Sequence, residues 1–265
     1  MNIVITGSTK GIGFGMAREF LKRGHNVMIS SRRPDAVEKS VADLRADFPG
    51  RTISGQVCDV AEYEQVEVLW TKSVEALEQV DIWVNNAGTD GKKVPFFALP
   101  KDNYVQTIKT NMIGMMNCNS VVIPGMYKQG SGSIFNMEGF GSNGMTRPGA
   151  SVYGATKYAL YYFTKSLVAE LENTPVNMCY LSPGIVVTDM LVPPPDQRGE
   201  GWEQVKKILN VLADTVETVT PFLVDGMLNN HDNGDAVRWL TKGKIMRRFF
   251  MNRFKKRDIF TPLGL

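Results

Sequence analysis

A tyrosine and a lysine four residues apart, Tyr153 and Lys157, form the pair in this sequence best suited to acid–base chemistry. They fall in a helical pattern, in which residues i and i+4 share one face. A phenol has a pKa of about 10, but a neighbouring ammonium group favours the phenolate and lowers that pKa. The pair could therefore act as a general acid that protonates a carbonyl oxygen under hydride attack.

A glycine-rich turn near the start of the chain is a candidate phosphate-binding site. Gly7, Gly11 and Gly13 lie between an apolar stretch, residues 3–5, and a helical pattern over residues 14–23. Small residues there permit a tight turn and close approach of a pyrophosphate to the N–H groups of a helix N-terminus. The trio is a weak signal alone, but its place at the first strand–helix junction makes it specific. The alternative is a purely structural turn.

The residues after the second predicted strand favour NADP(H) over NAD. NAD binding usually needs an acidic residue about 20 residues after the glycines, to bind the ribose 2′-OH. Here the strand ends in Ser31, Arg32 and Arg33. Ser31 could bind a 2′-phosphate oxygen, Arg32 could pair with the phosphate, and Lys10 could reach it from the glycine turn. The alternative is that Arg32 and Arg33 form a solvated turn.

The elements that must position these residues alternate between strands and helices. Strand patterns are predicted at residues 3–5, 27–29, 52–58, 81–84, 133–136 and 176–181, and helical patterns at 14–23, 35–48, 62–77, 102–127 and 152–172. This alternation predicts an α/β fold, a doubly wound parallel sheet with helices on both faces. It stops after Pro183, so we expect one domain over residues 1–265, with a helical substrate-side region at 189–235 and a basic tail at 236–265.

Composition excludes several classes of protein. The chain has 265 residues, 43% hydrophobic and 22% charged, as in soluble globular proteins, and it has no apolar run of membrane-spanning length. Cys58, Cys118 and Cys179 form no CxxC pair, so we expect buried thiols in a reducing compartment and no metal site. No targeting segment precedes the first strand pattern, which predicts a cytoplasmic protein.

The net charge of +3 conceals two populations of charge. Residues 242–258 hold eight basic residues and one acid, leaving 22 basic and 26 acidic residues elsewhere, a net charge of −4. Aromatic residues and methionines alternate with these cations. Such a segment could pack on its own domain, lie peripherally on an anionic membrane, or bind nucleic acid, of which the last is the least expected.

Taken together, these motifs resemble the short-chain dehydrogenase/reductase family over essentially the whole chain. The resemblance implies a single Rossmann-type domain with Tyr153 as the catalytic acid/base, Lys157 holding the nicotinamide ribose and tuning Tyr153, and Asn111 holding a water in the proton relay. It implies no metal. The residues expected to contact NADP(H) are Gly7, Ser8, Thr9, Lys10, Gly11, Ile12, Gly13, Ser31, Arg32, Asp59, Val60, Asn86, Ala87, Gly88, Tyr153, Lys157, Pro183, Gly184, Val186 and Thr188.

One departure from the family pattern affects the catalytic set. The serine pair usual after the fifth strand is absent from the stretch 136–142, which reads Asn-Met-Glu-Gly-Phe-Gly-Ser. A hydroxyl is still needed to bind the substrate carbonyl oxygen, and Ser142 is the nearest candidate. Glu138 is either a substrate contact or a structural acid in a salt bridge, and the second is favoured.

The same stretch resembles the chlorophyll(ide) b reductase branch of the family, which reduces the 7-formyl group of chlorophyll b to hydroxymethyl. That branch implies NADPH and a large, flat, apolar carbonyl substrate, for which residues 190–195 and 202–228 could wall a pocket. The alternatives are a reductase of another aldehyde or ketone (3-oxoacyl, sugar or steroid-like) and a non-enzymatic dinucleotide sensor. The family also implies a homodimer or homotetramer, assembled through the helices that carry Asn111 and Tyr153.

Overall fold

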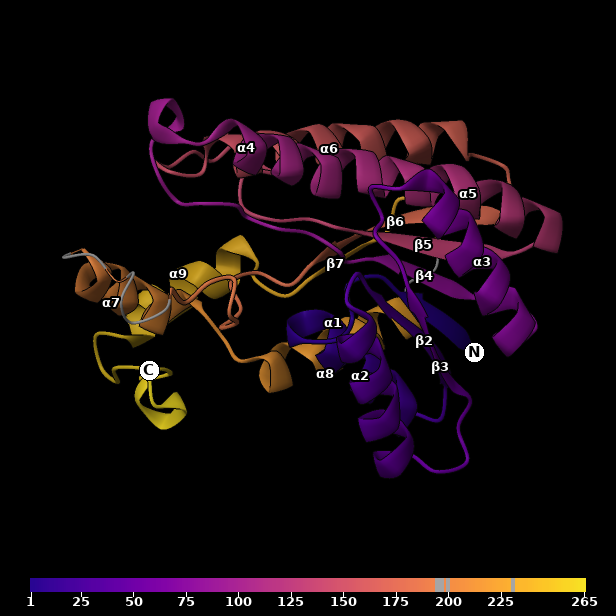
Figure 1. Ribbon diagram of the computed structural model, residues 1–265. Helices are drawn as coiled ribbons and strands as arrows, with labels where there is room; N and C mark the ends of the chain where they lie inside the picture. The colour runs from indigo at the N-terminus through magenta and orange to yellow at the C-terminus, as the bar shows by residue number, and fades with distance from the viewer. Residues whose placement is uncertain (194–197, 199–200, 230–231) are drawn as a thin grey trace.

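A seven-stranded parallel sheet forms the centre of the molecule (Figure 1). The computed structural model describes residues 1–193, 198, 201–229 and 232–265. The strand order is β3-β2-β1-β4-β5-β6-β7. The strands are β1 (Asn2–Ile5), β2 (Asn26–Ser31), β3 (Ile53–Val57), β4 (Ile82–Asn85), β5 (Gly132–Met137), β6 (Val176–Ser182) and β7 (Ala236–Arg238). The order reverses between β1 and β4, where ligands bind in open α/β sheets.

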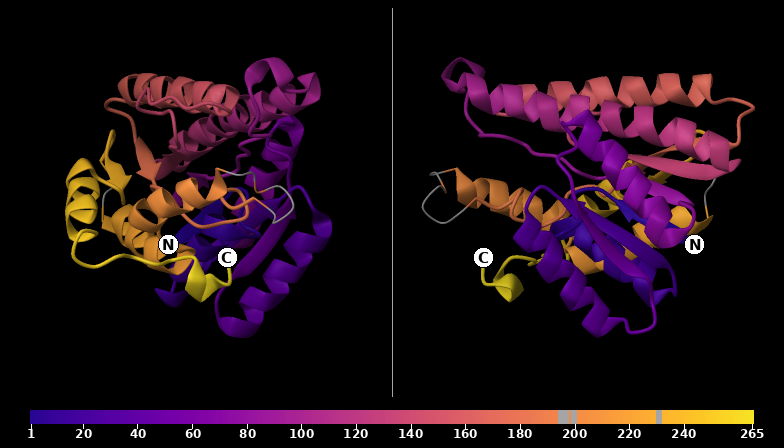
Figure 2. Two further views of the ribbon diagram at one scale, coloured as in Figure 1. Left: turned by 90° about the vertical axis from the view of Figure 1, so that its left-hand side faces the viewer. Right: turned by 45° about the vertical axis from the view of Figure 1, so that its right-hand side comes forward.

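Helices cover both faces of the sheet, as predicted. They are α1 (Gly11–Lys22), α2 (Pro34–Asp47), α3 (Tyr63–Leu77), α4 (Lys101–Ile108), α5 (Gly114–Gln129), α6 (Ser151–Glu170), α7 (Trp202–Leu212), α8 (Val216–Asn229) and α9 (Lys242–Met251). In Figures 1 and 2, α1, α2 and α8 lie on one face and α3 to α6 on the other, while α7 and α9 lie beyond the end of the sheet toward which the strands run.

The strands are apolar because both of their faces are buried. On β1, Ile3 and Ile5 join the core beneath α1, α2 and α8, whereas Val4 joins the core beneath α3, α5 and α6. Trp83 on β4 is fully buried in the second core. Continuous apolar runs of this kind are typical of parallel sheets covered on both sides, so the predicted fold class is confirmed.

The helix predicted at residues 102–127 is interrupted. Between α4 and α5 lies a π-helical turn, η2 (Lys109–Ile113), which contains Asn111. The turn is only five residues long, so the hydrophobic pattern of the sequence does not distinguish it from the α-helices on either side. Turns of this type occur mainly as single bulges in α-helices and often at functional sites.

The prediction that alternation stops after Pro183 is wrong. The helix α8 packs on α1, where Gly15 is in contact with Val216, and β7 extends the sheet beside β6. β7 has three residues and α8 contains Pro221, so neither gives a clear periodic signal. Within the predicted substrate-side region, 189–235, the helix at the carboxyl end of the sheet is α7 (Figure 1). Pro194 and Pro195 of the expected pocket wall lie outside the described residues.

The C-terminal segment is built into the fold. Phe260 is fully buried in a small core with Leu209 of α7, and the Asp214 carboxylate binds two tail arginines, Arg248 and Arg257. Part of the basic tail therefore packs on its own domain, which was one of the three roles predicted for it. Among the described residues, no helix is both long and apolar enough to cross a membrane.

Candidate active site

Tyr153, Lys157 and Ser142 converge on the backbone of Gly139. A Cβ at position 139 would collide with the Tyr153 hydroxyl and would lie 3.0 Å from Lys157 Cε. The Gly139 N–H donates to Ser142 Oγ at 3.0 Å. The loop after β5 and the first turns of α6 thus bring the three predicted catalytic side chains around one residue, and only glycine leaves room for them there.

Ser142 is the hydroxyl that this loop places where the serine pair is missing. With Tyr153 in its present position, a Cβ at residue 139 would collide with the tyrosine hydroxyl. Ser142 is buried, and its N–H donates to Gly139 O at 3.1 Å, which closes a tight turn. Gly141, at φ +99°, lets the turn pack on the backbone of Gly154.

Burial sets the proton affinities of the pair. Desolvation raises the pKa of Tyr153 to about 12, with a further rise from Asp90 and a smaller opposing effect of Arg147. Desolvation lowers the pKa of Lys157 to about 8, against a rise from Glu138. The Lys157 ammonium lies 6.0 Å from the centroid of the Tyr153 ring. Burial therefore shifts the pKa of Tyr153 upward in this structure, opposite to the lowering expected from Lys157.

Lys157 is fixed in position by the sheet. Its ammonium donates to Met137 O at 3.0 Å, at the end of β5, and the residue is buried. Beside it, Glu138 forms an ion pair with Arg238 of β7 at 3.0 Å. Glu138 is therefore the structural acid that was favoured from the sequence.

Asn111 is locked within the π turn. Its Nδ2 donates to Thr89 O at 2.9 Å and to Thr156 Oγ1 at 3.1 Å, and its Oδ1 accepts the Thr89 N–H at 2.9 Å. Thr156 in turn donates to the Tyr153 carbonyl at 2.7 Å. Asn111 is therefore joined to the helix that carries Tyr153, and its amide makes two donations and accepts one hydrogen bond inside the protein.

The glycine turn is shaped by the strand beside it. Gly7 has φ +62°, and a Cβ there would lie 2.8 Å from Ala87 Cα. A Cβ on Gly13 would lie 2.6 Å from Asn86 Nδ2, which donates to the carbonyls of Thr6 and Gly7. Asn86 and Ala87 thus hold the turn from the end of β4. Gly88 follows them, next to Asn111.

The turn opens onto the N-terminus of α1, as phosphate binding requires. No side chain caps this helix and no acid lies in its first turn. The Ser8 hydroxyl is used inside the protein, since it donates to Ile5 O at 2.6 Å and accepts the Ser30 N–H at 3.0 Å. Thr9 and Ile12 are half-buried beside it. The uncapped N–H groups of Gly11 to Gly13 are suited to a pyrophosphate.

The cations expected at the 2′-phosphate are exposed. Arg32 is half exposed and lies 3.8 Å from Asp59, and Lys10 forms a largely exposed pair with Asp189 at 2.9 Å. Exposed pairs of this kind are weak and exchange readily. Ser31, at the end of β2, accepts the Arg33 N–H at 3.4 Å. This donor set fits a phosphate, with Arg32 as its centre.

The other expected contacts border the same edge of the sheet. Val60 is buried against Gly114 of α5. A Cβ on Gly11 would lie 3.5 Å from Thr188 Cγ2, which places Thr188 over the glycine turn. Val186 is buried and bridges to Asp214, while Pro183 is buried and Gly184, at φ +72°, packs on Leu240.

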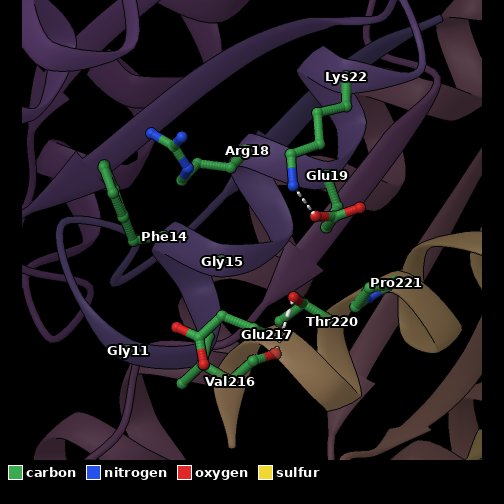
Figure 3. Close-up of a pocket in the computed structure, with 10 residues that line it drawn as sticks. All are labelled: Gly11, Phe14, Gly15, Arg18, Glu19, Lys22, Val216, Glu217, Thr220 and Pro221. Carbon is green, nitrogen blue, oxygen red and sulfur yellow. Dashed lines mark hydrogen bonds and ion pairs between the residues drawn. The ribbon is translucent and has the colours of Figure 1, made fainter. Parts of the chain in front are cut away.

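The cavity shown in Figure 3 does not hold the reacting groups. It has a volume of about 510 Å³ and lies between α1 and the start of α8. Gly11 is its one residue from the glycine turn, and its charged wall includes the Lys22–Glu19 pair at 2.6 Å. In the described ranges, no group of three His, Cys, Asp or Glu side chains is placed to hold a metal ion.

Several residues of the site were missed by sequence reasoning. Thr89 and Thr156 hold Asn111, Asp90 and Arg147 act on Tyr153, and Arg238 neutralises Glu138. Of these residues, Thr156 could have been found from the sequence, because it lies between Tyr153 and Lys157 on the same predicted helix. The others belong to loops whose approach to the site depends on the whole fold.

The comparisons with known proteins agree with this geometry. A family model described as short chain dehydrogenase matches residues 1–199. Chlorophyll(ide) b reductase NOL, chloroplastic, is 38% identical over 258 residues in Oryza sativa subsp. japonica, covering 94% of this chain and 74% of that protein. The Arabidopsis thaliana protein of the same name is 39% identical, covering 94% of this chain and 72% of that protein. The branch resemblance predicted from residues 136–142 is confirmed.

Solved structures give the same result. The closed form of a serine dehydrogenase complexed with NADP+ superposes with a TM-score of 0.77 at 25% identity, covering 91% of this chain and 95% of that one. ElxO with NADP bound has a TM-score of 0.75 at 26% identity, covering 89% and 96%. With the sheet order, the glycine turn and the Tyr153–Lys157 pair, these findings show that the chain belongs to the short-chain dehydrogenase/reductase family of oxidoreductases.

Proposed function

We propose that the protein is an NADPH-dependent reductase of the formyl group of chlorophyll b or chlorophyllide b. Two of its most similar relatives carry the name chlorophyll(ide) b reductase. The observation that carries the proposal is the grouping of Ser142, Tyr153 and Lys157 around Gly139, in the stretch that departs from the usual family pattern.

The reaction consumes one hydride and one proton. The aldehyde R–CHO, NADPH and H⁺ give the alcohol R–CH₂OH and NADP⁺, so the formyl carbon gains the hydride and its oxygen gains the proton. The cofactor supplies the hydride when bound. The protein has to hold the carbonyl oxygen and deliver a proton to it.

The site residues divide these tasks. The Ser142 hydroxyl, held by the Gly139 N–H, donates to the carbonyl oxygen and fixes its direction. Tyr153 stays protonated over the whole neutral range, since its pKa is about 12, and donates its proton to the developing alkoxide. Lys157 is anchored on Met137 O, with its ammonium 6.0 Å from the centroid of the Tyr153 ring, and would hold the nicotinamide ribose.

NADPH is favoured over NADH by the end of β2. That strand is followed by Arg32 and Arg33 in place of an acid, and neighbouring structures of at least 25% identity contain NADP+ or NADP. An arginine pairs with the 2′-phosphate and would gain nothing from a plain 2′-OH. Arg32 would exchange its weak ion pair with Asp59, at 3.8 Å, for the phosphate.

Reduction of a ketone is the second candidate function. A 3alpha-hydroxysteroid dehydrogenase of Mediterraneibacter gnavus is 30% identical over 193 residues, covering 73% of this chain and 76% of that protein. The steroid in the name of that protein is bulky and apolar, like the substrate expected here. The two candidates place different carbonyls in the same site.

A panel of carbonyl compounds separates these functions. The purified protein is given NADPH with chlorophyllide b, chlorophyll b in detergent, a 3-oxosteroid and a 3-oxoacyl thioester, and cofactor absorbance is followed. We expect kcat/KM for chlorophyllide b to be at least ten times the kcat/KM for either ketone. Preference for a ketone would assign the second function, and NADH used as well as NADPH would refute the cofactor proposal.

We propose that the protein is a homo-oligomer assembled through α5 and α6. Tyr158 and Tyr162 on α6 are exposed, with Tyr127 on α5, and large aromatic side chains are typical of interface cores. A monomer in light scattering at micromolar concentration would contradict this.

The three cysteines are buried and free, which supports a reducing compartment such as the cytoplasm.

A further inference from the structure

The outer side of α9 is an exposed surface of unusual composition. Met246, Phe249, Phe250 and Phe254 are 73%, 50%, 59% and 75% exposed. Three of them lie at positions i, i+3 and i+4 of the helix, and Phe254 follows in the next turn, where its ring lies 5.4 Å from that of Phe250. We call these four residues the α9 face. Contiguous apolar surface of this kind marks an interaction site.

The helix is turned the opposite way from an ordinary surface helix. Its inner side carries Arg248, whose guanidinium binds the buried Asp214 carboxylate at 2.7 Å, and Lys244, whose ammonium lies over the Trp239 ring. A surface helix normally turns its apolar residues inward and its charges outward. Here the protein holds the aromatic side outward with a buried ion pair, so the α9 face is a fixed feature and not a frayed end.

Cations surround the α9 face. Two of the basic residues in this segment, Arg248 and Arg257, are used by Asp214. Lys244 lies over the Trp239 ring. The remaining five, Lys242, Arg247, Arg253, Lys255 and Lys256, are all exposed, and no acid occurs between residues 242 and 257. Apolar side chains ringed by lysine and arginine are complementary to a membrane surface with anionic headgroups and an apolar interior.

The α9 face belongs to a helix at the same end of the molecule as the site (Figures 1 and 2). α7 and α9 pack together beyond the end of the sheet toward which the strands run, the end that carries Tyr153 and the glycine turn (Figures 1 and 2). Val205 and Ile208 of α7 are exposed there as well. A surface docked here would bring an apolar substrate close to the site.

We propose that the protein docks peripherally on anionic lipid membranes through the α9 face and its surrounding cations. A nucleic acid would use the same cations, but it would leave three phenylalanines and a methionine in water. The proposal goes beyond the proposed function, since it holds whichever carbonyl the site reduces.

Vesicle sedimentation tests the proposal with the full chain. The protein is mixed with vesicles of phosphatidylcholine alone or with about a third phosphatidylglycerol, at low and at high salt. We expect sedimentation with the anionic vesicles, weakened several-fold by salt and nearly lost with the neutral ones. No sedimentation at low salt would overturn the proposal, as would equal sedimentation with both kinds of vesicle.

Variants locate the surface. The double variant Phe249→Ser, Phe254→Ser and the charge reversal Lys255→Glu, Lys256→Glu should each lower vesicle binding at least ten-fold. The matched charge control is Lys39→Glu, Lys72→Glu, which changes two exposed lysines on α2 and α3 and should leave binding unchanged. Circular dichroism melting shows that each variant is folded.

Other occupants of the α9 face give different results. If the phenylalanine variant lowers the oligomeric state in the absence of lipid, the α9 face binds a second copy of the chain and the proposal is wrong. If the lysine variant loses affinity for a DNA fragment while vesicle binding persists, it is also wrong.

Discussion

The sheet body, which is residues 1–193 together with α8 and β7, and the C-terminal cap, which is residues 201–215 and 239–265, hold their functional groups in different ways. In the body, Asn111, Lys157 and Ser142 are fixed by hydrogen bonds to nearby backbone groups. The cap depends on one carboxylate, Asp214, which is 4% exposed and binds Arg248, Arg257 and the Trp239 indole.

This difference separates catalysis from attachment. The backbone of Asp214 bonds to Ile185 and Val187, so the same residue joins the cap to the loop that carries Thr188. Substitution of a catalytic side chain in the body should therefore abolish the reaction and leave the fold intact. Loss of Asp214 should loosen the cap and the edge of the cofactor site together.

The largest effect on activity should come from Tyr153→Phe in the body. It removes the proton donor and should lower kcat about a thousand-fold, the range for a general acid. NADPH binding, measured by fluorescence, should stay within about two-fold, because the phenol is not a phosphate ligand. The control is Tyr162→Phe on the exposed side of the same helix, and equal losses in the two variants would show that Tyr153 has no special role.

The cap should respond to Asp214→Ala through stability. Two arginines lose a buried partner, and breaking such a pair should lower the free energy of unfolding by about 3 kcal/mol. Asp189→Asn removes the exposed partner of Lys10 and should cost below about 1 kcal/mol. Thermal melting compares the two, and equal shifts would remove the distinction between body and cap.

Cofactor choice should change with Arg32→Ala. Loss of one charged hydrogen bond to the 2′-phosphate should raise KM for NADPH about 20-fold and leave KM for NADH nearly unchanged. Steady-state kinetics with both cofactors measures this. Arg33→Ala serves as the neighbouring control, and an equal rise for both cofactors would contradict the assignment of Arg32.

The smallest expected effect is a dependence of kcat on pH. Burial lowers the pKa of Lys157 to about 8, so its ammonium is present below that pH and is lost above it, while Tyr153 remains protonated throughout. Reduction should therefore be constant below pH 7 and fall about four-fold by pH 8.5.

Glu138→Gln sharpens this test. It removes the acid that raises the pKa of Lys157, so the fall should begin at lower pH. A profile that rises with pH would contradict the assignment.

Much of the body could be predicted from the sequence. Apolar runs such as residues 3–5 and 81–84 directly precede their functional turns, and the spacing of Tyr153 and Lys157 places both on one helical face. These features are local, and local patterns survive in the folded chain. The site residues named from them lie at the same edge of the sheet.

The remainder depends on contacts between distant segments. The π turn at Asn111 spans only five residues, too few to be recognised from a hydrophobic pattern. The three residues of β7 form a strand through their pairing with β6. The Asp214 carboxylate binds two arginines that lie more than 30 residues away in the sequence. The pKa of Tyr153 was predicted with the wrong sign because burial cannot be read from a spacing of four.

The central claim is that this site transfers a hydride to a formyl carbon and a proton to its oxygen. NADPH carrying deuterium at the transferable C4 position, incubated with chlorophyllide b and the protein, tests it by mass spectrometry of the product. We expect a hydroxymethyl product with one deuterium on the former formyl carbon, and none with the Tyr153→Phe variant. Cofactor oxidation without deuterium in the pigment, or equal labelling by the variant, would contradict the claim.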